Sequence, residues 1–95
     1  ITEFLETFFK LYPTASENQL DYYVKSDAMQ PINSNLKFVE IFNTVFQGIG
    51  EDIQVNVDVK YCDVFSKAIN YFQYRLKIQK YGTWMIIESK KKIYN

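Results

Sequence analysis

The stretch IQVNVDVKY, residues 53–61, decides the fold because apolar and polar side chains alternate along its whole length. The stretch FQYRLKIQ, residues 72–79, alternates in the same way. Successive side chains of a strand point to opposite faces, so each stretch predicts a β-strand with one buried face. The residues expected to face inward are Ile53, Val55, Val57, Val59, Phe72, Leu76 and Ile78, with the hydroxyls of Tyr61 and Tyr74 as the only polar groups among them.

Two further strands are expected beside this pair. Residues 36–46 are rich in β-formers, and their apolar side chains fall on both faces, which is typical of a central strand. Tyr81 and Gly82 turn the chain, and residues 83–93 form the last strand. The connections are short, which makes neighbouring strands antiparallel.

The region ahead of the strands predicts a pair of amphipathic helices. Apolar residues recur at helical spacing over residues 4–12, and Pro13 ends this first helix. Ser16 and Gln19 then form a capping box that starts a second helix. Helices gathered on one face of an antiparallel sheet define the α+β class, so we expect a single domain over residues 1–95 with its N-terminal helices packed on a four-stranded antiparallel sheet.

The composition gives little support for catalysis. The chain has 95 residues, one cysteine, Cys62, and no histidine, so the commonest general base and metal ligand is missing. Glu51 and Asp52 are neighbours in a glycine-rich turn and point apart, and Gly48 and Gly50 do not precede a helix as the glycines of a dinucleotide-binding loop do. We therefore expect no catalytic residue, no cofactor and no metal.

The charge pattern gives little support for nucleic-acid binding. The net charge is zero, with −3 over residues 1–35 and +3 over the remainder, and the basic run 90–92 is interpreted as a solvated strand end. No apolar run approaches the roughly 20 residues that span a bilayer. The chain begins at Ile1 rather than Met, so we expect it to be a piece excised from a longer protein.

The register of the last hairpin decides which of its residues face outward, and two registers are open. The favoured register joins opposite charges by pairing Arg75 with Glu88. It leaves Trp84 and Ile86 as an outward apolar pair, and such a pair often marks a protein interface. In the other register Gly82 lies in a three-residue loop, and the same pair faces the core.

Two segments resemble the TcpC family of conjugative transposon and plasmid proteins from Gram-positive bacteria. They are FLETFFKLYPTASENQLDYYVKSDAMQPIN, residues 4–33, and YRLKIQKYGTWMI, residues 74–86. The features that carry the resemblance are the aromatic first helix, the Ser16 cap, the Pro31 loop and the final hairpin through Trp84. The order of elements resembles the nuclear transport factor 2-like cone, in which N-terminal helices curl against a bent four-stranded sheet.

The resemblance implies a scaffold rather than an enzyme. Such proteins are similar to the VirB-type assembly factor of type IV secretion channels, and they hold channel components together outside the cytoplasmic membrane. The implied partners are other conjugation channel proteins or a second copy of the chain, with a transmembrane helix upstream in the parent protein. The same cone also hosts enzymes and binders of small apolar ligands, which is the alternative function, although the inward residues predicted here fill its pocket with apolar side chains.

Overall fold

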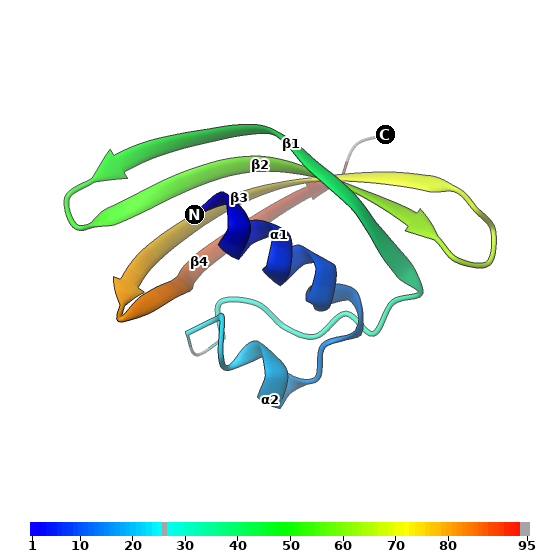
Figure 1. Ribbon diagram of the computed structural model, residues 1–95, viewed down its shortest axis with the longest axis horizontal. Coiled ribbons are helices and arrows are strands. Elements are labelled where there is room, and N and C mark those ends of the chain that lie inside the picture. Colours follow the sequence, from blue (N-terminus) through cyan, green and yellow to red (C-terminus); the bar gives the residue numbers. More distant parts are fainter. Residues whose placement is uncertain (26, 94–95) are drawn as a thin grey trace.

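A curved sheet of four antiparallel strands, in the order β1-β2-β3-β4, forms one layer of the structure (Figure 1). The structure is a computed structural model that describes residues 1–25 and 27–93, so Ser26, Tyr94 and Asn95 of the predicted domain lie outside it. The α+β class and the antiparallel four-stranded sheet are confirmed, and the helices lie under the concave face. The strands are β1 (Leu36–Ile49), β2 (Asp52–Asp63), β3 (Ile69–Tyr81) and β4 (Thr83–Ile93).

The helical layer comprises α1 (Thr2–Leu11), a 3₁₀ turn η1 (Tyr12–Thr14) and α2 (Glu17–Leu20). The predicted capping box is confirmed, because the Ser16 N–H donates to Gln19 Oε1 at 2.8 Å and the Gln19 N–H donates to Ser16 Oγ at 3.3 Å. α2 is a single turn because the chain then leaves the helix to meet the sheet. There Val24 forms a parallel bridge with Ile86 of β4.

The core lies between α1 and the concave face of the sheet. Leu5, Phe8 and Phe9 of α1 are fully buried there. The predicted inward residues of β2 and β3 are buried against them, except that Ile53 is only half-buried. The alternation of apolar and polar residues in β2 and β3 therefore predicts correctly which face of these strands is buried.

The carbonyl of Phe9, near the end of α1, accepts its hydrogen bond from a core side chain rather than from the helix backbone. In a regular helix this carbonyl accepts a hydrogen bond from the N–H of residue 13, but Pro13 has no N–H. The hydroxyl of Tyr61 donates to the Phe9 carbonyl oxygen instead, at 2.8 Å. The hydroxyl of Tyr74, by contrast, is buried with no hydrogen-bond partner among the described residues.

Phenylalanine at these two tyrosine positions is expected to change stability in opposite directions. Tyr61→Phe leaves the Phe9 carbonyl buried and unpaired, so it should destabilise the domain by roughly 1–3 kcal/mol. Tyr74→Phe removes a hydroxyl that has no partner, so it should stabilise the domain by about 1 kcal/mol. Urea unfolding of both variants and of the unchanged chain measures the two differences, and equal losses in both variants would contradict this arrangement.

The position of β1 corrects the sequence interpretation. The sequence predicts a central strand, but β1 is an edge strand whose ladder joins it to β2 alone among the described strands. Burial of both faces therefore does not explain its apolar side chains. β1 also runs past the predicted end, through Gly48 to Ile49, and the chain turns at Gly50, whose φ is 61°.

The β3–β4 hairpin has neither of the two predicted registers. Gly82, with a φ of 76°, is the single residue between the paired Tyr81 and Thr83. A glycine adopts this left-handed conformation at little cost. The register then pairs Ile78 with Ile86, and both side chains face the core.

Beyond this point the hairpin ladder shifts by one residue. Ile87 is the extra residue of β4, so Glu88 pairs with Lys77, and the predicted pairing of Glu88 with Arg75 is wrong. Lys90 is the residue opposite Arg75. A bulge inserts one extra residue, so the positions of β4 that face the core change from even to odd numbers beyond Ile87. Residues 88–92 are all polar, so their alternation does not reveal this change.

The predicted outward orientation of Trp84 and Ile86 is also wrong. Ile86 is 0% exposed, and Trp84 is half-buried against the core. The Lys80 ammonium lies over the Trp84 ring, 5.4 Å from its centroid. Because Ile86 offers no side-chain surface, the protein contact expected of this pair now depends on Trp84 and stays a prediction.

Candidate protein-contact surface

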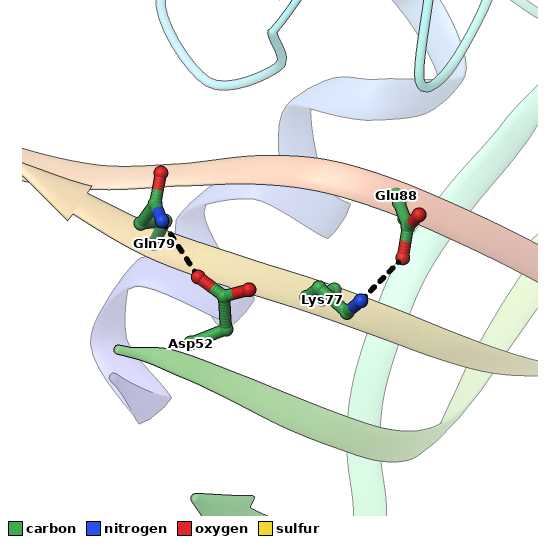
Figure 2. Close-up of polar contacts among 4 residues, drawn as sticks. All are labelled: Asp52, Lys77, Gln79 and Glu88. Atoms are coloured by element: carbon green, nitrogen blue, oxygen red, sulfur yellow. Dashed lines mark hydrogen bonds and ion pairs between the residues drawn. The ribbon is translucent and has the colours of Figure 1, made fainter. Parts of the chain in front are cut away.

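Polar side chains on the outer face of the sheet link three strands (Figure 2). Gln79 of β3 donates from Nε2 to Asp52 Oδ1 of β2 at 2.7 Å, and Lys77 of β3 forms an ion pair with Glu88 of β4 at 2.9 Å. The hydrogen bond to Glu88 raises the pKa of the Lys77 ammonium. These side chains are already paired within the chain, so they hold the sheet together rather than offer free groups to a partner.

Two grooves of about 660 and 590 Å³ are lined by residues of this face and of β4. Arg75 and Lys90 line both grooves, and most of the other lining residues are also polar or charged. Small-molecule pockets are mostly apolar with a few polar groups. The lining of these grooves therefore gives little support for a small apolar ligand.

Most of the exposed large apolar side chains gather in two places, while Tyr22, Tyr71 and Tyr81 lie elsewhere. The first place is β1, and the second is the turn between β2 and β3. The exposed apolar residues are Val39, Val45, Phe46 and Ile49 on β1, and Val64, Phe65 and Ile69 at the turn.

The outer edge of β4 is protected against pairing with another strand. Residues 23–25 cover its middle, because the Ile86 N–H donates to the Tyr23 carbonyl at 2.8 Å and the Lys25 N–H donates to the Ile86 carbonyl at 2.9 Å. Further along, the lysines of the run 90–92 are exposed. Exposed lysines disfavour edge-to-edge pairing, so this edge is a poor site for a partner strand.

The outer edge of β1 lacks such protection over its second half. Both register shifts of β1 lie before Val45, and the ladder with β2 is regular from Val45 to Ile49. Residues 41–50 contain no charged side chain and no proline. Val45 is 58% exposed, and Phe46 and Ile49 are exposed as well. A regular, uncharged, apolar edge is the kind that accepts a further strand, so residues 45–49, the free β1 edge, form the candidate contact surface.

Sequence reasoning missed the free β1 edge, although one signal of it was present. The uncharged run 41–50 is visible in the sequence. A strand that is apolar on both faces, however, is equally typical of a buried central position. The strand order alone distinguishes the two positions.

The residues considered for chemistry stay apart from one another. Cys62 is half-buried near the end of β2, and its thiol donates to the carbonyl of Asp63 at 3.6 Å. Within residues 1–25 and 27–93, no group of three or more His, Cys, Asp or Glu side chains could hold a metal ion. No helix in that same part of the chain has the length and apolar character needed to span a bilayer.

The fold and the exposed surface define a small α+β domain with one free, apolar sheet edge. The family model of the conjugative transposon protein TcpC matches residues 1–87, so the chain belongs to this family. It is therefore a component of conjugative transposon transfer, and the family suggests interaction with other transfer proteins. No curated protein and no solved structure matches the chain.

Proposed function

We propose that this domain is a non-enzymatic assembly component of a Gram-positive conjugative type IV secretion channel. It contacts other channel proteins and has no reaction of its own. Membership of the TcpC family supports the role in transfer. The filled concave face, where Phe8, Phe9 and Tyr74 occupy the place of a pocket, favours a scaffold over the alternative of a small-ligand binder or an enzyme.

The main structural support for this proposal is the free β1 edge. The outer edge of a strand presents unpaired N–H and C=O groups, and a partner strand bonds to them while side chains on the two faces give specificity. Val45 and Ile49 lie opposite Asn56 and Asp52 on the outer face, and Phe46 lies opposite Val55 on the inner face. An added strand would thus meet exposed apolar side chains on both of its faces.

The proposal includes a nuclear transport factor 2-like cone and a location outside the cytoplasmic membrane. Helices under the concave face of a sheet of sequential antiparallel strands support the cone. The location requires an apolar segment of roughly 20 residues upstream of Ile1 in the parent protein. A parent reading frame without such a segment would argue against this location.

Two lysines on the free β1 edge are expected to block the contact without unfolding the domain. Val45→Lys/Ile49→Lys in the full-length parent should lower conjugative transfer at least about tenfold, which corresponds to about 1.4 kcal/mol of lost association. Both side chains are exposed, so the far-UV circular dichroism and the urea midpoint of the double variant should stay close to those of the unchanged domain.

Tyr22→Lys is the matched control, because Tyr22 is exposed and lies apart from β1. It should transfer normally. A photocrosslinking residue at Gln47, next to the two lysines, should capture a transfer protein in mating cells, and the double variant should lose this adduct. Normal transfer by a folded double variant would refute the contact through β1.

A further inference from the structure

The turn between β2 and β3 lies at one end of the sheet (Figure 1), and it carries an exposed aromatic side chain. Phe65 is 78% exposed at this turn, and Val64 and Ile69 beside it are exposed as well. The turn lies at the opposite end of the sheet from the β1–β2 and β3–β4 turns. These apolar side chains are separate from the free β1 edge and are not used by the contact proposed there.

The turn holds Phe65 in a fixed place. The Asp63 carboxylate accepts hydrogen bonds at Oδ1 from the N–H groups of Phe65 and Ser66, both at 2.9 Å. The Asp63 N–H donates to the Ala68 carbonyl at 2.9 Å, and the Val64 N–H donates to the Asn35 carbonyl at 3.0 Å. The amide hydrogen bonds from Ser66 and Phe65 lower the pKa of the Asp63 carboxyl. The exposure of Phe65 is therefore built into an ordered turn.

Lys67 completes the turn in a conformation that a glycine would adopt more easily. Its φ is 65°, and its ammonium donates to the Val64 carbonyl at 2.8 Å. A lysine in the left-handed region costs more than a glycine. The chain thus keeps a positive charge beside Phe65 where backbone geometry alone would favour glycine.

Further lysines surround the turn. Lys37 lies opposite Cys62 at the start of β1, and Lys60 lies opposite Tyr71, with its ammonium 6.0 Å from the centroid of that ring. The acidic groups at this end are Asp63, which accepts hydrogen bonds within the turn, and Glu40, which lies opposite Lys60 in the β1–β2 ladder. Positive charge therefore exceeds negative charge around the exposed apolar turn.

We propose that the β2–β3 turn docks on an anionic phospholipid surface, with Phe65 entering the headgroup region and the lysines lying at the phosphates. Exposed aromatic side chains partition into the interface, and cationic side chains are attracted to anionic headgroups. One turn is too small for a stable protein interface, which needs about 800 Å² from each partner. It is large enough for a shallow contact of a few side chains with a bilayer.

Co-sedimentation of the domain with vesicles tests this docking. Vesicles of phosphatidylglycerol and phosphatidylcholine in equal parts should carry the domain into the pellet at low salt, and vesicles of phosphatidylcholine alone should not. Phe65→Ser should weaken the partition at least about tenfold, because it removes the inserting side chain. Added salt should weaken it as well, since the lysines contribute through charge.

Tyr22→Ser is the matched control, because Tyr22 is also 78% exposed but lies far from the turn in sequence and in the fold. It should bind vesicles like the unchanged chain. Phe65→Trp should keep binding, and its emission should shift to the blue on anionic vesicles by more than the emission of the unchanged chain, which contains Trp84.

Several outcomes would overturn the docking. They are no pelleting with anionic vesicles at low salt, equal losses in Phe65→Ser and Tyr22→Ser, or unchanged pelleting of a folded Phe65→Ser. The docking would also be overturned if a photocrosslinking residue at position 65 captured a protein while Phe65→Ser left vesicle binding unchanged. The turn would then be a protein contact. None of these results bears on the free β1 edge, whose transfer experiment uses different residues.

Discussion

Ile86→Lys is expected to unfold the domain, whereas lysine at the adjacent Met85 should be tolerated. Ile86 is 0% exposed and pairs with the core residue Ile78, so an ammonium at this position would lie in the core without a partner. Removing the packed side chain costs roughly 2–5 kcal/mol, and burying a charge adds to that. Such a loss approaches the whole stability of a domain of this size.

Met85→Lys is the control that separates the observed register from the one favoured by the sequence. Met85 is half-buried opposite Gln79 on the outer face, so its lysine reaches solvent and should cost about 1 kcal/mol or less. In the register favoured by the sequence the roles of the two positions are exchanged. Circular dichroism and urea unfolding of both variants decide between them, and a folded Ile86→Lys beside an unfolded Met85→Lys would refute the structure of this hairpin.

Raising the pH above about 10 is expected to lower the stability steeply. Burial raises the pKa of the Tyr61 and Tyr74 hydroxyls above their ordinary value of 10.0, and neighbouring tyrosines add to the effect. Above that pH an unfolded tyrosine loses its proton while the buried one keeps it, so the unfolded state binds fewer protons and the free energy of unfolding falls. Below about pH 10 the contribution is fully present, and above it each group loses roughly 1.4 kcal/mol per pH unit.

Urea unfolding at several values between about pH 9 and pH 11.5 measures this slope. Tyr74→Phe is the matched variant, because it removes one of the buried titrating hydroxyls and keeps the ring. Its free energy of unfolding should fall less steeply with pH than that of the unchanged chain, because Tyr61 and Tyr12, whose pKa burial also raises, still titrate. A free energy that stays constant over this range would mean that these tyrosines ionise in the folded domain, which contradicts their burial.

The sequence correctly predicts the parts of this fold that are set by a local pattern of residues, namely the alternating strands and the capping box. The alternation in residues 53–61 and 72–79 falls within β2 and β3, and the last strand has the predicted bounds 83–93. The predicted inward residues of β2 and β3 are correct, apart from the half-buried Ile53, because a sheet with one covered face requires that alternation. The capping box at Ser16 and Gln19 is correct because its two hydrogen bonds are local.

The features that the sequence does not predict depend on neighbours that are distant along the chain. The edge position of β1 depends on strand order, and the one-residue turn at Gly82 sets which of Trp84, Met85 and Ile86 face the core. A shift of one residue moves side chains to the opposite face, which is why Trp84 and Ile86 were expected outward. The apolar side chains of β1 were expected to be buried because the strand was predicted to be central, whereas their exposure follows from the edge position of β1.

The bridge between Val24 and Ile86 can form during synthesis only once nearly all of the domain has left the ribosome. α1 is synthesised first, but the hydroxyl that completes its end belongs to Tyr61, and the strand that anchors residues 23–25 is β4. Contacts between residues 52 positions apart cannot form while the second partner is still inside the ribosome. The aromatic face of α1 therefore leaves the exit tunnel without a surface to cover it. That face stays uncovered until the strands that pack on it have emerged, and the contact of residues 23–25 with the sheet forms only after Ile86 has emerged.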